Sequence, residues 1–388
     1  MPHRSLQAYY AFTVLSSLRL TDGLWILYLL HCHWTLWQVG LAESGFHLVS
    51  FLSDLPTGIF ADTVGPRRSL IAGLAIGAAA TVSTFLTAPH HIIWAMVSIS
   101  LGSLGWTFIG GADQALLFHI GQEASEVSYP RLYGRTVAMA LLSNAAAVAA
   151  GGWLAASVGW DIPYVLTAAF KLLALASVLK LPPGPSLPTR AQPAQHHTPF
   201  PALRQALARP PLVLLIAFGS VVGITATINS LYAQSTLTVE GGSLAAVSAV
   251  IAASYLTQAA GAWLSTRSRW ESASPRVRLA TAALGAGILA TGTVPFWAAS
   301  PSFLLSCQAD GYMEPLYESA LNDQIPGALR ATLLSLPGTG FSLGMIIFFP
   351  VAGWALSHHH RAVVYWVLAA ATLAMALAFP KIRPDPAN

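Results

Sequence analysis

The chain has 388 residues, of which 55% are hydrophobic and 9% are charged, and its mean hydropathy is +0.60. Such a composition excludes a soluble globular protein, because a water-exposed surface brings the charged fraction to about 25%. The sequence therefore predicts an integral membrane protein.

Apolar runs close to the ~20 residues needed to cross a bilayer occur about twelve times along the chain. Short polar or charged turns separate most of these runs, so we expect no soluble catalytic domain at either end. The pattern predicts an all-α membrane protein with twelve transmembrane helices. The predicted helices begin near Ala8, Gln38, Ser69, Ile92, Gly134, Ile162, Leu212, Ser243, Leu279, Ser302, Ala331 and Ala362.

The longest break in this pattern lies in the middle of the chain, where nine prolines occur between Leu181 and Pro211. Proline-rich composition without an apolar run is typical of a linker. Within it, Leu203 and Leu207 lie one helical turn apart, a spacing that suits a short interfacial helix. We expect an N-terminal six-helix bundle over residues 1–181, a cytoplasmic linker over 182–210 and a C-terminal six-helix bundle over 211–388.

The basic residues predict the orientation, because positive side chains near helix ends stay on the cytoplasmic side. With the N-terminus inside, sixteen basic residues are cytoplasmic and Arg361 alone lies outside. We therefore expect a multi-pass protein of the plasma (inner) membrane with both termini cytoplasmic. The net charge of +4 reflects this topology and indicates no nucleic-acid partner. The sixteen residues are Arg4, Arg67, Arg68, Arg131, Arg135, Lys180, Arg190, Arg204, Arg209, Arg267, Arg269, Arg276, Arg278, Arg330, Lys381 and Arg383.

A charged break between the second and third apolar runs carries a distinctive pattern. It consists of Gly58, three residues, Asp62, two residues, Gly65, a spacer, and then Arg67 and Arg68. This pattern resembles the signature loop of the major facilitator superfamily, and the compact chain resembles the twelve-helix drug-efflux branches of that family. The resemblance implies two pseudo-symmetric six-helix bundles with alternating access between them.

In that family the signature residues form a conformational latch rather than the substrate site. The resemblance implies that Asp62 caps the positive end of helix 11 near Ala331. It also implies that Arg67 or Arg68 pairs with Asp113 in helix 4. Surface ion pairs of small value are the alternative interpretation. The latch residues are Gly58, Asp62, Gly65, Arg67, Arg68 and Asp113.

Charged side chains inside a bilayer are costly unless they face a partner or a cavity. Arg19 and Asp22, three residues apart in the first predicted helix, form either a self-neutralising pair or a coupling site. Glu43 and His47, four residues apart in the second predicted helix, share a face and suit proton exchange. Both pairs are candidates for proton coupling or substrate binding.

The tenth predicted helix carries a stripe of acids, Asp310, Glu314 and Glu318, at successive four-residue steps. A stripe of carboxylates suits a proton relay, because each can take and release a proton as its surroundings change. Glu318 alternatively pairs with Arg267 or Arg330. We therefore take Asp310 and Glu314 as the candidates for coupling or binding.

Aromatic and amide side chains at the expected depth of the cavity are candidates for lining it by stacking and hydrogen bonding. Tryptophans in membrane proteins are also common as anchors at the membrane interface, and this is the alternative interpretation for Trp25 and Trp106. The candidates are Trp25, Trp106, Asn229, Tyr232, Tyr255 and Gln258.

No nucleotide-binding motif is present, so a gradient must supply the energy, and the excess of buried acids favours protons. We expect proton-coupled export of a small amphipathic or cationic compound. Proton-coupled uptake of a small metabolite, and a non-transport receptor or scaffold on the same fold, are the alternatives. We expect no enzyme activity, cofactor or metal site, and a monomer whose partners are a small-molecule substrate, protons and the lipid bilayer.

Overall fold

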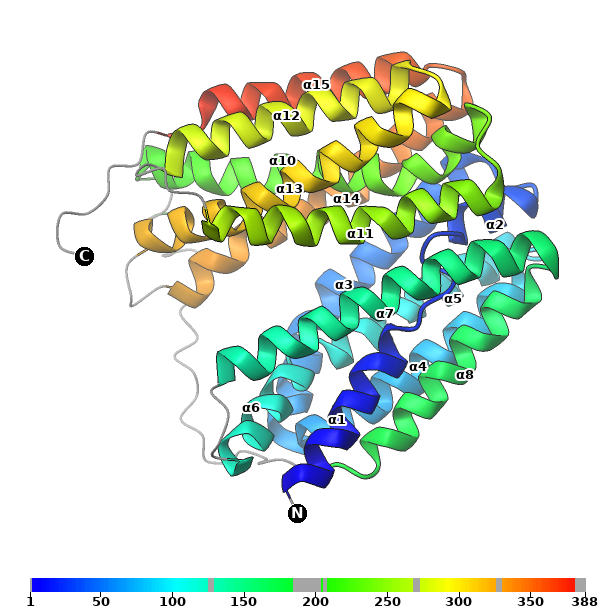
Figure 1. Cartoon of the computed structure of the whole chain (residues 1–388), viewed down its shortest axis with the longest axis vertical. Helices are drawn as coiled ribbons and strands as arrows, with labels where there is room; N and C mark the ends of the chain where they lie inside the picture. Colours follow the sequence, from blue (N-terminus) through cyan, green and yellow to red (C-terminus); the bar gives the residue numbers. More distant parts are fainter. Residues whose placement is uncertain are drawn as a thin grey trace. The chain divides into compact units, whose positions relative to one another are not determined.

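The computed structural model describes residues 2–124, 129–183, 204, 208–267, 273–325 and 330–380. This part of the chain is helical and contains no strand, which confirms the predicted all-α fold (Figure 1). Most of the predicted linker, including the interfacial helix predicted around Leu203 and Leu207, lies outside the described residues.

The described residues form fourteen helices, because two of the twelve predicted spans each consist of two helices. The first span contains α1 (Pro2–Ser17) and α2 (Trp25–His31), and the fourth contains α5 (Ile92–Ile109) and α6 (Ala112–Ala124). The others are single helices: α3 (Leu36–Val64), α4 (Pro66–Thr87), α7 (Tyr129–Ser157), α8 (Asp161–Val178), α10 (Pro210–Val239), α11 (Leu244–Arg267), α12 (Ala273–Thr293), α13 (Phe296–Gln324), α14 (Arg330–Ser357) and α15 (Arg361–Ala378).

Eight helical segments of the described chain are long and apolar enough to cross a membrane. Two of the remaining helices, α3 and α13, contain 29 residues each, but their sequences include several acids. These acids lower the hydropathy of helices that are otherwise long enough to span a bilayer. The protein is a multi-pass membrane protein, and the helices with weaker hydropathy carry most of its acidic candidates.

The chain divides into two compact units, Met1–Ala194 with Leu244–Ala252, and Gln195–Ser243 with Ala253–Asn388. The change at residue 194 falls within the segment predicted as linker. In the first unit, α4 packs against α5 and α8, and α1 packs against α7 and α8. In the second unit, α12 packs against α13 and α15, and α10 packs against α14 (Figure 1).

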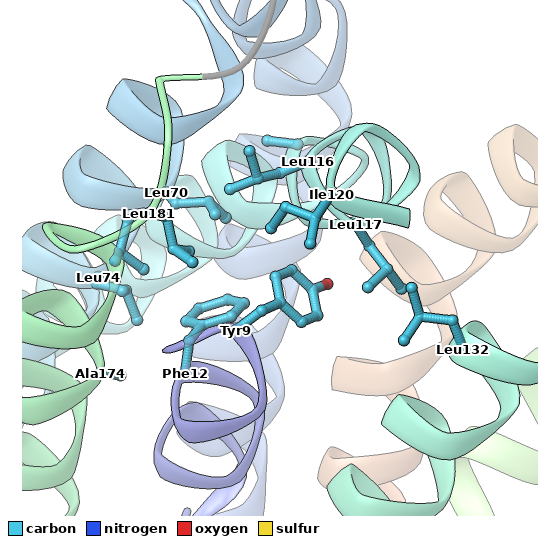
Figure 2. Packing of buried hydrophobic residues seen from close by; sticks show 12 residues of the cluster. Tyr9, Phe12, Leu70, Leu74, Leu116, Leu117, Ile120, Leu132, Ala174 and Leu181 are labelled. Atoms are coloured by element: carbon cyan, nitrogen blue, oxygen red, sulfur yellow. The ribbon is translucent and has the colours of Figure 1, made fainter. Parts of the chain in front are cut away.

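A cluster of buried hydrophobic residues joins five helices of the first unit (Figure 2). The rings of Tyr9 and Phe12 meet edge to face at 5.6 Å, and the Tyr9 hydroxyl donates to the Asp113 backbone oxygen at 3.1 Å. Lipid tails are as apolar as these side chains, so the cluster stabilises the unit chiefly through close packing. It consists of Tyr9, Phe12, Leu70, Leu74, Ala112, Leu116, Leu117, Ile120, Leu132, Ala174, Val178 and Leu181.

The charged break between the second and third predicted helices is much shorter than the sequence suggests. Helix α3 continues through Val64 and α4 begins at Pro66, so a single residue, Gly65, separates them. Gly65 has a φ of +106°, which side-chain-bearing residues rarely adopt. Pro66 suits the first helical turn because that turn needs no backbone N–H donor. The predicted loop is therefore corrected to a one-residue turn, and Asp62 is an exposed residue of α3.

Candidate functional site

A polar pocket of about 170 Å³ lies within the second unit. Helices α10, α11, α12 and α13 supply its lining, and most of the lining side chains are polar. Four of them are candidate site residues predicted from the sequence: Asn229, Tyr255, Gln258 and Asp310. The polar lining residues are Thr227, Asn229, Ser230, Ser254, Tyr255, Gln258, Ser306, Cys307 and Asp310.

Hydrogen bonds between side chains connect the helices around this pocket. Gln258 Nε2 of α11 donates to Asp310 Oδ2 of α13 at 3.0 Å. Asn229 Nδ2 of α10 donates to Ser306 Oγ of α13 at 3.1 Å. The Asn229 side chain is 2% exposed, and its Oδ1 atom accepts no hydrogen bond from the described residues. A buried acceptor without a protein donor calls for a ligand or a water as its partner.

Two glycines let α11 and α13 approach closely enough to form this pocket. A Cβ atom added at Gly311 would lie 2.1 Å from the Gln258 backbone oxygen, and one added at Gly261 would lie 2.1 Å from the Gln308 backbone oxygen. Real Cβ atoms do not approach backbone that closely. The crossing therefore depends on both glycines, and it holds Gln258 beside Asp310.

The Asp310 carboxylate is the one charged side chain among the described lining residues, which gives the pocket a distinct electrostatic character. No lysine, arginine or histidine occurs among its described lining residues. Asn229 adds an unpaired acceptor, and the Tyr255 ring offers a surface for stacking. The pocket can thus accept a cation or a molecule rich in hydrogen-bond donors, and it disfavours an anion.

The first predicted helix is interrupted at residues 18–24, which corrects the placement of Arg19 and Asp22 in one continuous helix. The two side chains still form an ion pair, with Arg19 Nε 3.0 Å from Asp22 Oδ2. Backbone freed by such a break needs partners that lipid cannot supply. Thr167 Oγ1 provides one by accepting a hydrogen bond from the Leu20 backbone N–H at 3.1 Å.

A lysine that is not among the candidates predicted from the sequence, Lys171, lies in the interior of the first unit. Lys171 Nζ of α8 donates to the Gly77 backbone oxygen at 3.1 Å and to Thr81 Oγ1 at 2.7 Å. Thr81 in turn donates to the same Gly77 oxygen at 2.8 Å. These bonds stabilise an ammonium group inside a membrane segment and join α8 to α4.

Replacing Thr81 by valine should destabilise the first unit by about 1.5–3 kcal/mol, the typical cost of losing a hydrogen bond to a charged group. The volume stays similar, but Lys171 keeps only the Gly77 oxygen among its described partners. Thermal unfolding of the detergent-purified protein measures the effect. Thr293→Val is the matched control, because Thr293 makes the same type of intrahelical bond at an exposed position. Equal unfolding temperatures for the two variants would contradict this role of Thr81.

The second predicted pair in the first unit is formed as expected from its spacing. His47 Nε2 lies 3.4 Å from Glu43 Oε1 on α3, and each residue is 9% exposed. Their proximity permits proton exchange between the two side chains. Their role in coupling stays a prediction.

The proposed latch residues lie in the first unit, but the described ion pairs do not connect them. Arg67 donates to the Leu179 backbone oxygen, and Asp113 Oδ1 accepts from the Gln114 backbone N–H at 2.7 Å. Arg68 is exposed, as is Asp62. Gly58 has open space around its Cα, since an added Cβ would meet nothing within 4 Å.

The remaining cavity candidates occupy different surroundings. Trp106 is 55% exposed, and the Arg19 guanidinium lies 5.3 Å from the centre of its ring. Trp25 begins α2. Tyr232 is 1% exposed, stacks on Phe349 at 4.4 Å and donates to the Phe349 backbone oxygen at 3.0 Å, so its described contacts join α10 to α14.

The acidic stripe on α13 is divided between different surroundings. Asp310 lines the pocket, whereas Glu314 and Glu318 are exposed and are not among the lining residues. Sequence reasoning missed Ser254 and Ser306, which line the pocket one helical turn before Gln258 and Asp310 respectively. That four-residue spacing is the signal that indicates their position on the same helix faces.

Comparisons with known proteins agree with this architecture. A family model described as the Major Facilitator Superfamily matches residues 11–336. A variant of the nucleoside transporter NupG has a TM-score of 0.80 and 14% identity, with 97% of this chain and 98% of that chain covered. A D-xylose-proton symporter has a TM-score of 0.72 and 14% identity, with 98% of this chain and 96% of that chain covered. A POT family transporter in complex with 5-aminolevulinic acid has a TM-score of 0.68 and 10% identity, with 96% of this chain and 94% of that chain covered. No curated protein sequence matches this chain.

Proposed function

Because this chain belongs to the major facilitator superfamily, we propose that it couples the export of a small cationic or amphipathic compound to the entry of protons. The observation that carries this proposal is the Asp310 carboxylate, which lies in a polar pocket whose described lining residues include no basic side chain. Gln258 holds this carboxylate, and Asn229 supplies a further acceptor. A protonated amine satisfies both groups, because it carries a positive charge and N–H donors, whereas a quaternary ammonium group neutralises the carboxylate alone.

The pocket supports exchange rather than simple binding. A carboxylate away from bulk water is stabilised either by a proton or by a bound cation. Because either one neutralises its single negative charge, the proton and the cation compete for the same carboxylate. Proton binding to Asp310 on one side of the membrane therefore favours release of the cation there. Cation binding on the opposite side favours release of the proton. This competition couples the two movements when access alternates between the sides.

The signature residues supply the conformational control in this proposal. Asp62, the neighbouring arginines Arg67 and Arg68, and Asp113 act as the latch while the cytoplasmic side is closed. Gly65 supports this role, because its backbone turn places the two arginines at the start of α4. The asymmetry of basic residues, sixteen against one, supports an orientation in the plasma (inner) membrane with both termini cytoplasmic. A monomer is part of the same proposal.

Proton-coupled uptake of a small metabolite is the second candidate. It is favoured by the basic residues of the first unit, Arg19 and Lys171, which suit a solute with acceptor groups. Two proteins of similar fold are named as a nucleoside transporter and as a D-xylose-proton symporter. At 14% identity this likeness extends to the fold alone.

Vesicles that contain the purified protein and a pH gradient separate these candidates. With acid inside, an export substrate added outside should exchange for lumenal protons and dissipate the gradient. With acid outside, an uptake substrate added outside should carry protons inward. Quaternary amines belong in the panel beside neutral and anionic compounds, because they cannot cross the bilayer as free bases. Protein-free vesicles control for leakage.

We expect dissipation by quaternary amines in the acid-inside vesicles alone. Dissipation by neutral or anionic compounds in the acid-outside vesicles would replace export with uptake. No response in either arrangement, despite binding to the purified protein, would favour a receptor or scaffold role and contradict the proposal.

A further inference from the structure

A second cavity of the second unit, of about 320 Å³, differs from the polar pocket in both position and chemistry. It lies between α11, α12 and α13, and most of its lining side chains are aliphatic. On α13 it is lined by Leu305, Gln308, Ala309 and Tyr312, whereas Ser306, Cys307 and Asp310 line the polar pocket. The two cavities therefore use different faces of the same helix.

This cavity is amphipathic along its length. On α12 its lining runs from Arg276 through Leu279 and Ala280 to Ala283, which spans about 10 Å at the rise of an α-helix. Arg276 Nε donates to the Tyr312 hydroxyl of α13 at 3.1 Å, so these two groups mark one end. The opposite end holds Ala283, and Gln308 is the other polar side chain of the lining.

The arginine at the polar end is unusually buried for a cation. Arg276 is 9% exposed, its Nη2 atom donates to the Ser265 backbone oxygen, and its guanidinium lies 5.5 Å from the centre of the Tyr312 ring. The part of the cavity lining that the structure describes contains no carboxylate beside it. The surrounding sequence is also basic, with four arginines and one glutamate over residues 267–278.

The rim of the cavity is apolar and open. Leu264, Leu279 and Leu305, one from each of the three helices, are 42%, 63% and 51% exposed. In a membrane protein, exposed aliphatic side chains of this kind contact lipid tails. An apolar rim that leads to a buried arginine matches a molecule with a long hydrocarbon chain and an anionic head.

We propose that this cavity binds an anionic phospholipid, with an acyl chain between α11, α12 and α13 and the phosphate beside Arg276. A phospholipid brings the acyl chain and the negative charge together, so it complements both ends of the cavity. The bound lipid would brace α12 against α13, which also carries Asp310. This site is independent of the proposed transport substrate.

Native mass spectrometry of the detergent-purified full chain tests the proposal, with phosphatidylglycerol and phosphatidylcholine of identical acyl chains as probes. Wild-type protein should retain phosphatidylglycerol about fivefold more strongly, as expected for a contact with one basic residue. Arg276→Gln should abolish this preference. Ala283→Leu should weaken retention of both lipids, because it fills the apolar end of the cavity.

Arg135→Gln is the matched control, because Arg135 is an exposed arginine of the first unit. It should bind both lipids as the wild type does. Equal retention of the two lipids by the wild type, or a preserved preference in Arg276→Gln, would overturn the proposal. If Arg276→Gln fails to fold, the headgroup preference of the wild type and the loss in Ala283→Leu decide the question. Normal lipid retention by a folded Ala283→Leu variant would also overturn it.

Discussion

Asp310→Asn is expected to abolish proton-coupled transport while leaving the protein folded. Asparagine keeps the shape of the side chain and an oxygen that can accept from Gln258, whose Nε2 atom lies 3.0 Å from the carboxylate. It removes the charge that a proton or a cation would neutralise. Truncating one partner of a buried charge pair costs about 2–5 kcal/mol of binding, which corresponds to a loss of affinity of at least about 30-fold.

Asp310→Asn should not lower the stability of the protein, although it lowers transport and amine affinity. Removing a charge from a membrane segment removes its desolvation cost, so the unfolding temperature should stay the same or rise. Loss of transport without loss of stability distinguishes a functional carboxylate from a structural one. The measurements are dissipation of a pH gradient by quaternary amines, amine binding to the purified protein, and thermal unfolding.

Asp161→Asn is the matched control for this experiment. Asp161 lies exposed in the first turn of α8, in the first unit, and undergoes the same chemical change away from the pocket. Its transport should equal that of the wild type. If Asp310→Asn also transports and binds amines normally, the assignment of Asp310 as the exchange site is wrong.

Gly311→Ala is expected to destroy the pocket and destabilise the second unit. The new Cβ atom would lie 2.1 Å from the Gln258 oxygen and 2.8 Å from its carbonyl carbon. Both atoms belong to backbone, so α11 must move away from α13 as a unit. Overpacking of this kind costs typically 1–3 kcal/mol. The improved helix propensity of alanine returns only about 1 kcal/mol, so destabilisation should prevail.

The expected results are a lower unfolding temperature and a loss of amine binding, because the displacement separates Gln258 from Asp310. Gly261→Ala provides an independent test of the same crossing from the other helix. Gly338→Ala on α14 is the control, since a Cβ there would meet nothing within 4 Å, and it should leave the protein equally or more stable. Equal unfolding temperatures for Gly311→Ala and Gly338→Ala would show that the helices tolerate a wider crossing.

The sequence by itself determined the all-α membrane architecture and the family. Both depend on local properties: the length of each apolar run matches the thickness of a bilayer, and backbone inside lipid must satisfy its own hydrogen bonds, which favours helices. The signature residues from Gly58 to Arg68 are contiguous, so their pattern can be recognised without any tertiary information. Intramembrane acids such as Asp310 are also apparent, because they are rare and costly in such segments.

The tertiary structure decided which of these residues meet. Asn229, Gln258 and Asp310 come from three helices, and their convergence depends on how each helix is rotated about its axis. A soluble helix reveals that rotation through its apolar face, but a helix in lipid is apolar on all sides. The interruption around Arg19 and Asp22 was hidden for a similar reason. It depends on a partner 147 residues away, Thr167, which accepts from the Leu20 N–H, and no local pattern encodes such a contact.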